Sequence, residues 1–319
     1  MKKSVSGFGV PGFFIALLAI TISLFTACDK DDSTNSGTAS TTIKITDAPI
    51  DDASVAGAFV TISDIKLDGQ SVQGFTKTTV DVNAYHNGAT KTLGTFNLAG
   101  RTYSNITFVL DYDMDANGAS PGSYITTTGG TKHKLQSTAP SITINKSLAL
   151  SGNSSIVADF DLRKMITRQS GGGTDQYDFA TATELESSIR VVAESKSATI
   201  AGTLTNSAVG SGKIIAYAYK KGTYNRSTEM QASGTSNIQF KNAVSSSVVN
   251  GSGNYQLHFL ESGEYEIHFA NYTDTNADGQ LELNGTLVVV GAAGLNLLGL
   301  NLNAGATLTA NATATAILP

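Results

Sequence analysis

Oxygen-bearing side chains near residue 280 have the spacing of a calcium-binding loop. Counted from Asp274, such side chains take the first, third and fifth positions. Gly279 takes the sixth position, where a sharp turn is needed, and the seventh position contributes a backbone carbonyl. The twelfth position is Gly285, so the bidentate glutamate of a full EF-hand is missing, and a glutamate in the ninth position is the candidate replacement, directly or through water. The predicted ligands of a structural calcium ion are Asp274, Asn276, Asp278, Gln280 and Glu282. The alternative is a metal-free turn made by the same Asx and Gly residues.

A second loop repeats the spacing with fewer ligands. Asp113, Asp115 and Asn117 stand two residues apart and precede Gly118. The later positions of this loop carry no carboxylate, so a calcium ion would have too few charged ligands. A solvated loop is the favoured interpretation, with calcium at these three residues as the alternative.

Two patterns point to catalysis or transition-metal binding only weakly. Residues 118–122 satisfy the Gly-x-Ser-x-Gly pattern around Ser120, but strand-like sequence follows where a nucleophile elbow needs a helix. If residues 261–264 form a hairpin turn, then His258, Glu266 and His268 share one face of a sheet. Such a group is able to bind zinc or copper, although a solvated sheet face is the favoured interpretation. The chain is therefore not expected to be an enzyme.

Two tyrosines raise the question of a sugar-binding surface. Tyr217 and Tyr219 are two residues apart, so both side chains lie on the same face of a strand. Exposed and coplanar rings would stack on a sugar, whereas buried rings would belong to the core, which is the favoured interpretation.

The first residues of the chain predict export and lipid anchoring. Lys2 and Lys3 precede an apolar run, residues 13–25, which is shorter than the roughly 20 residues needed to span a bilayer. Ala27 and then Cys28, the only cysteine, follow in the pattern of a bacterial lipoprotein signal. We expect cleavage after residue 27 and a lipid anchor with palmitate-type chains on Cys28, because durable anchoring needs more than one acyl chain.

The residues after the cysteine suggest a destination. The acidic and lysine-containing stretch at residues 29–32 resembles the export signal of surface-exposed lipoproteins in Bacteroidota-type bacteria. This resemblance implies the outer membrane, with the protein facing the cell exterior. Residues 28–41 lack hydrophobic periodicity and are expected to form a flexible tether.

Composition limits the classes of partner. The formal net charge is −5, and removal of the signal takes away two lysines and no acid, so the remaining chain is more acidic still. An acidic chain is a poor phosphate binder, so nucleic acid is not expected as a partner. One cysteine allows no internal disulfide, so the fold must be stabilised by core burial, to which bound ions could contribute.

Alternating apolar residues and frequent turn residues predict an all-β fold. Short runs such as residues 42–46, 104–111 and 155–161 alternate with period two, and Gly-containing turns separate them. The one clear helical candidate is 162–167, with Asp161 as its N-cap. We expect two β-sandwich domains in tandem, at residues 42–195 and 196–319, after the signal peptide and tether.

Four motifs in order identify a family for the first of these domains. They are the segment 43–49 (Ile-Lys-Ile-Thr-Asp-Ala-Pro), the step 98–103 with Tyr103, the segment 159–164 (Asp-Phe-Asp-Leu-Arg-Lys) and the closing segment 189–192. Together they resemble domain of unknown function 4382, over about residues 42–194. The resemblance implies an exported β-rich domain and brings no catalytic residue, cofactor or ligand.

Residues 198–319 resemble a transthyretin-like sandwich of the carboxypeptidase regulatory type. The matching features are strand and turn residues, such as those at 200–204 and 253–257, and they imply a non-catalytic module. The expected function is a non-enzymatic binding or structural lipoprotein with an envelope or extracellular ligand, either protein or glycan. A glycan-capture accessory of an uptake system and a cryptic hydrolase are the alternatives.

Calcium binding at residues 274–282 predicts a calcium-dependent melting temperature. Calcium at about 100 times its dissociation constant would stabilise residues 33–319 by about 2.7 kcal/mol relative to a chelator. Asp278→Ala should abolish this rise in differential scanning calorimetry. An unchanged melting temperature in the parent chain would show that the loop is a metal-free turn.

Overall fold

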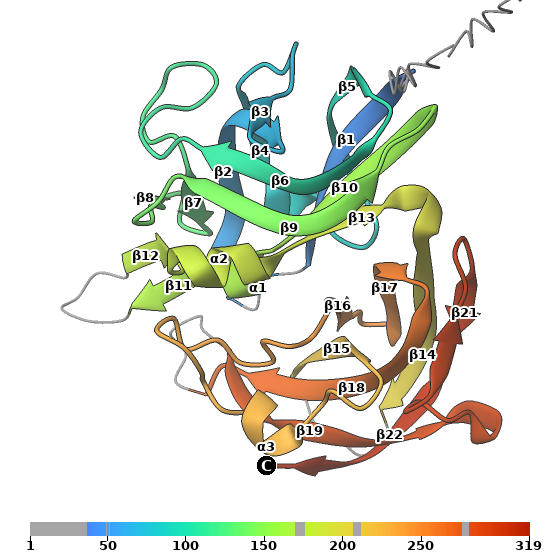
Figure 1. Cartoon of the computed structure of the whole chain (residues 1–319). Coiled ribbons are helices and arrows are strands. Elements are labelled where there is room, and N and C mark those ends of the chain that lie inside the picture. Colours follow the sequence, from blue (N-terminus) through green and yellow to red (C-terminus); the bar gives the residue numbers. More distant parts are fainter. Residues whose placement is uncertain (1–36, 49, 51, 170–175, 207–211, 276–280) are drawn as a thin grey trace, which may run out of the picture. The chain divides into compact units, whose positions relative to one another are not determined.

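A computed structural model describes residues 37–48, 50, 52–169, 176–206, 212–275 and 281–319. The first half of the chain is built almost entirely of strands (Figure 1). Its elements are β1 (Thr38–Ala48), β2 (Val55–Leu67), β3 (Gln70–Ser71), β4 (Thr78–Asp81), η1 (Val82–Ala84), β5 (Lys91–Ala99), β6 (Thr102–Leu110), β7 (Tyr124–Thr127), β8 (Lys132–Lys134), β9 (Ser141–Ala149), β10 (Asn153–Asp161), α1 (Leu162–Met165), β11 (Ile166–Gln169), β12 (Gln176–Phe179), α2 (Ala182–Ser188) and β13 (Ile189–Ala193).

The second half follows the short helix η2 (Glu194–Lys196). Its elements are β14 (Ser197–Asn206), β15 (Lys213–Lys220), α3 (Arg226–Glu229), β16 (Ser245–Val249), β17 (Asn254–Glu261), β18 (Gly263–Thr273), β19 (Glu282–Gly291), η3 (Ala292–Gly294), β20 (Leu300–Leu302), β21 (Thr307–Thr309) and β22 (Ala312–Leu318). The all-β prediction is confirmed. Within the described ranges, no helix is long and apolar enough to span a bilayer.

Two sheets and a ribbon form the first half. One sheet has the order β13-β10-β1-β5, and the other has the path β8-β7-β2-β6-β9, with β3 and β4 attached to β2. β11 and β12 form a separate two-stranded ribbon. β1 and β10 are parallel neighbours, and their register pairs Thr46 with Asp159 and Ala48 with Asp161. This pairing brings the C-terminal ends of two strands far apart in sequence to the same edge of the sheet.

The core of the first half lies between these two sheets. Ile43 and Ile45 of β1 are fully buried, as their alternation with polar residues predicts. Phe160 of β10 meets Phe108 of β6 edge to face, with ring centroids 5.3 Å apart. Such a pair joins the two sheets through both apolar burial and ring geometry.

One continuous path of strands forms the second half, in the order β16-β15-β18-β19-β22-β14-β17. β20 pairs with β18 and β21 with β14. The Gln256 N–H of β17 donates to Ser247 Oγ of β16 at 3.2 Å, so the two end strands of the path lie next to each other. β15 is buried on both faces: Ala216 packs in one hydrophobic cluster, whereas Tyr217 packs in another, with Phe240.

The two halves have separate hydrophobic clusters. The first cluster ends at Val191, and the next begins at Ala198, with η2 between them. Ser36–Pro319 nevertheless form one compact unit. The division into domains 42–195 and 196–319 therefore remains a prediction.

The structure differs from the sequence-based expectations at three places. β17 and β18 follow each other but do not pair, because β17 pairs with β14, and β18 pairs with β15, β19 and β20. The helix expected at 162–167 ends at Met165, and Asp161 makes no capping hydrogen bond to it. A second helix, α2, was missed although Thr181 and Glu184 form a capping box, a signal that the sequence contains.

The two-sheet core predicts a large cost for removing its central ring. Phe160→Ala should lower the free energy of unfolding by about 3–5 kcal/mol, because the sheets cannot close over the cavity. Val290→Ala is the control, because Val290 is 58% exposed and its loss should cost at most about 0.5 kcal/mol. Urea unfolding followed by circular dichroism measures both, and equal costs would contradict this description of the core.

Candidate functional site

A cluster of buried charges lies where β1 and β10 end. Asp47 is next to the last residue of β1, and Asp159 and Asp161 are at the end of β10. α1 follows directly and carries Arg163 and Lys164. The parallel register of the two strands places these side chains together, and all five residues are at least nine-tenths buried.

Oppositely charged partners neutralise the cluster. Asp161 Oδ2 lies 3.0 Å from Arg163 Nη2 and 3.1 Å from Lys164 Nζ. Asp159 Oδ2 lies 2.6 Å from Nη2 of Arg190, which comes from β13, the neighbouring strand. Buried charges are tolerated only when they are paired and hydrogen-bonded in this way.

The same cations also bind the backbone of the second half. Arg163 donates to the carbonyl oxygens of Gln239 at 2.5 Å and of Phe240 at 3.3 Å. Lys164 Nζ donates to the carbonyl oxygen of Ala243 at 2.7 Å. Arg190 donates to the carbonyl oxygens of Phe259 and His258. We call Asp159, Asp161, Arg163, Lys164 and Arg190 the charge clamp, because they join the two halves.

Burial is the main cause of the pKa shifts of Asp47, Asp159 and Lys164. It raises the pKa of Asp47 well above the ordinary value, although the Leu162 N–H that donates to Oδ1 opposes the shift. Burial also raises the pKa of Asp159, and the charge of Arg190 opposes this shift. Burial lowers the pKa of Lys164, and the charge of Asp161 opposes that shift. The second carboxylate oxygens of the three aspartates have no hydrogen-bond partner among the described residues.

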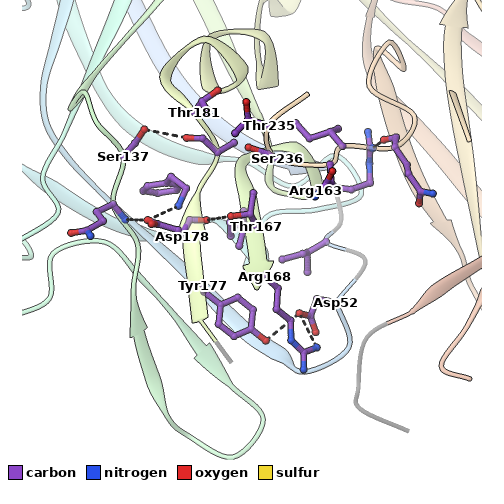
Figure 2. A pocket seen from close by; sticks show the side chains of 18 of the residues that line it. Asp52, Ser137, Arg163, Thr167, Arg168, Tyr177, Asp178, Thr181, Thr235 and Ser236 are labelled. Atoms are coloured by element: carbon purple, nitrogen blue, oxygen red, sulfur yellow. Dashed lines mark hydrogen bonds and ion pairs between the residues drawn. The ribbon is translucent and has the colours of Figure 1, made fainter. Parts of the chain in front are cut away.

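A polar pocket of about 550 Å³ lies beside the charge clamp. The ribbon β11–β12, residues 136–138 and residues 235–239 line it. Figure 2 shows Asp52, Arg168 and Tyr177 at one end and Thr181, Thr235 and Ser236 at the other. The Tyr177 hydroxyl donates to Asp52 at 3.1 Å, and Arg168 lies 3.5 Å from the same carboxylate. The volume is in the range of small-ligand sites.

Glu184 joins the pocket wall to α2. Its carboxylate accepts hydrogen bonds from the backbone and side chain of both Thr181 and Ser236. These hydrogen bonds lower the pKa of Glu184 to about 2, although burial acts in the opposite direction. Glu184 was not among the predicted site residues, although the capping-box pattern was a signal for it.

Most of the predicted calcium and lipid sites cannot be placed. Asn276, Asp278 and Gln280 lie outside the described residues, and so does Cys28. Glu282 accepts hydrogen bonds from Thr275 N at 2.7 Å and from Thr275 Oγ1 at 2.9 Å. Calcium at 274–282 therefore stays a prediction.

The second predicted calcium loop uses its carboxylates in other ways. Asp115 Oδ1 accepts from the backbone N–H groups of Asn117 and Ala119, each at 2.8 Å. Asp113 Oδ1 lies 2.7 Å from Lys134 Nζ. Among the residues that the structure describes, no group of three or more His, Cys, Asp or Glu side chains is placed to hold a metal ion.

The tyrosine pair is not a sugar platform. Tyr217 and Tyr219 are fully buried, so neither ring is able to stack on a ligand. Tyr217 stacks on Phe240 with ring centroids 4.4 Å apart, and the Tyr219 hydroxyl donates to Glu229 at 2.8 Å. The segment that contains α3 covers this face of the sheet, which sequence alternation alone does not reveal.

The predicted histidine group is also not formed. His258 contacts Gln256 Oε1 at 2.9 Å and Thr199 Oγ1 at 3.3 Å. His268 instead stacks on Tyr224 with centroids 3.6 Å apart, next to Glu266. β17 and β18 do not pair, so the two histidines are not cross-strand neighbours.

Comparison with known proteins identifies the first half. Residues 38–180 match the family described as "Domain of unknown function (DUF4382)". This segment is a DUF4382 domain. The match includes Asp47, Asp159, Asp161, Arg163 and Lys164 but ends before Arg190. Two of the four motifs that carried the sequence resemblance contain the residues of the buried cluster, and a third contains Arg190. The match does not reach residues 198–319, where the transthyretin-like resemblance remains weak.

The solved structures to which the chain is similar have very low sequence identity to it. A Bacillus cereus major pilin subunit is 10% identical, with 85% of this chain and 67% of that chain covered and a TM-score of 0.23. A putative cell adhesion protein from Bacteroides fragilis is 8% identical, with 86% and 92% covered and a TM-score of 0.19.

The Bacillus anthracis TIE protein is 8% identical, with 87% of this chain covered and a TM-score of 0.19, and the chain spans about a third of its length. TM-scores at this level establish no shared fold or function. No curated protein matches the chain.

The charge clamp predicts that loss of one cation is costly. Lys164→Met should lower the free energy of unfolding by roughly 3 kcal/mol, because it leaves buried polar atoms without a partner. Lys241→Met is the control: Lys241 is exposed on the contacted loop, and its loss should be nearly neutral. Urea unfolding of both variants measures the difference. A cost below about 1 kcal/mol for Lys164→Met would contradict the clamp.

Proposed function

We propose that the protein is an outer-membrane lipoprotein that faces the cell exterior and acts as a non-enzymatic structural or binding module. In this proposal the lipid on Cys28 holds the chain at the membrane, and the DUF4382 domain is fixed to the second half to present one rigid unit. Calcium at residues 274–282 would brace the second half.

The observation that carries the proposal is that the charged residues of the family motif at 159–164 make contacts inside the fold. Arg163 and Lys164, which offer the chemistry expected of a reactive site, are buried and donate to backbone carbonyls at residues 239–243. A catalytic acid or cation must reach a substrate. Groups that are already fixed in the interior stabilise the fold instead.

The histidines give the same indication. In the described part of the chain, none of the four histidines hydrogen-bonds a serine, and none of them lines the polar pocket, although His133 contacts the ring of Tyr177, which does. A serine hydrolase requires a base within hydrogen-bond reach of its nucleophile. This arrangement supports a binding or structural role over the hydrolase alternative.

Protease accessibility in whole cells tests the proposed location. Trypsin added to intact cells that express the full chain should degrade the protein, because exposed lysines such as Lys221 and Lys241 offer cleavage sites. Immunoblotting of intact and permeabilised cells measures the loss, with a periplasmic protein as the control for leakage. Survival on intact cells, followed by loss after permeabilisation, would contradict surface exposure.

Cys28→Ala is the matched variant for the anchor. Because the acyl chains are attached through this residue, the variant should leave the membrane fraction and fail to incorporate radiolabelled palmitate. Membrane retention of the variant together with palmitate labelling would overturn the anchoring site.

A further inference from the structure

We propose that the polar pocket beside the charge clamp binds a short, uncharged oligosaccharide. The proposal rests on the proposed function, because it names a ligand class for a non-enzymatic surface module. It also places the predicted glycan site at this pocket instead of at Tyr217 and Tyr219, which are buried. Three properties of the pocket carry it: balanced charge, unused neutral polar groups and a pre-formed wall.

The described acidic and basic side chains of the pocket are equal in number, and each already has an ion pair or a hydrogen bond. Among its described lining residues, the ionised side chains are two aspartates and two arginines. Asp52 is paired with Arg168, and Arg163 is paired with Asp161 and donates to carbonyl oxygens. Asp178 accepts from the backbone N–H groups of Gln136 and Phe179, each at 3.0 Å. A charged ligand would be desolvated in the pocket without gaining a new counter-charge.

Neutral hydrogen-bonding groups remain available. The side chains of Gln136, Thr138, Thr235 and Asn237 line the pocket, are exposed, and make no hydrogen bond within the described part of the chain. Hydroxyl and amide groups both donate and accept hydrogen bonds. A sugar has the matching chemistry, since each of its hydroxyl groups also does both.

The pocket wall is pre-formed. Glu184 holds Ser236 through backbone and side chain, and Arg163 holds Gln239. These contacts fix the segment 235–239 against the DUF4382 domain before any ligand arrives. A fixed wall lowers the ordering cost of binding, which favours a ligand that offers only hydrogen bonds.

A peptide is the less suitable ligand for this pocket. Extended peptides bind mainly by adding a strand to an open sheet edge. β12, which lines the pocket, pairs with β11 on one side, and on the other its Phe179 N–H donates to the Gln136 carbonyl at 3.1 Å. The ring of Tyr177 is 5% exposed, so recognition must use hydrogen bonds rather than ring stacking.

Isothermal titration with defined probes tests the inference. The full chain without its signal is titrated with maltotriose, mannotriose and xylotriose, with trigalacturonate as a charged sugar and with a capped Ser-Asn-Gly peptide. At least one neutral trisaccharide should bind, and more tightly than the trigalacturonate and the peptide. The double variant Gln136→Ala/Thr138→Val should weaken this binding by roughly tenfold, because two hydrogen-bonding side chains are lost.

The control variant is Gln73→Ala/Thr92→Val, which removes the same groups from exposed positions outside the pocket. It should bind as the parent does, and both variants should melt at the parent temperature. No binding of any neutral trisaccharide at millimolar concentration, preferential binding of the peptide or the charged sugar, or an unchanged affinity in the pocket variant would overturn the inference. None of these results changes protease accessibility on cells, so the proposed function is tested separately.

Discussion

Three aspartates buried at one end of a sheet impose the main constraint on this protein. An ionised carboxylate in the interior is tolerated only with cations and hydrogen bonds around it. α1 supplies Arg163 and Lys164 immediately after the aspartates of β10, and β13 supplies Arg190. These cations also donate hydrogen bonds to backbone carbonyl groups of the second half. The hydrogen-bond network of the buried cluster therefore extends beyond the DUF4382 domain.

The pocket is a consequence of the same arrangement. Residues 235–243 belong to the segment that covers the aromatic face of β15, and the clamp holds this segment against the ribbon β11–β12. Polar residues of both halves then face one another across a space that neither half encloses by itself. A site formed between two packed β-structures is a common location for ligand binding.

Sequence patterns predicted the positions of the strands better than they predicted which strands pair with each other. Alternation located β1, β6 and β10, and four motifs identified the family. The error at residues 257–269 came from treating neighbouring strands as a hairpin, whereas each pairs with strands distant in sequence. The core interpretation favoured for Tyr217 and Tyr219 is confirmed, but alternation does not indicate the segment that covers them, which starts after β15.

The candidate site was predicted only in part. The segment that carries Asp161, Arg163 and Lys164 was recognised as a family motif, but its contacts with Gln239 and Ala243 join residues more than 70 positions apart. Periodicity describes single elements and contains no information on such contacts. The capping box at Thr181 and Glu184 is a local signal, yet its link to Ser236 is again long-range.

The parallel pairing of β1 with β10 sets an order of events during chain synthesis. Ser40 pairs with Asn153, so the second residue of this parallel pair emerges 113 positions after the first. Until then β1 has only β5 as a neighbour, and closing so long a loop is entropically slow. The clamp acceptors at residues 239–259 emerge later still. The hydrogen bonds of the clamp are therefore completed only after residue 259 has been made, so the last contacts of the N-terminal half form with the C-terminal half.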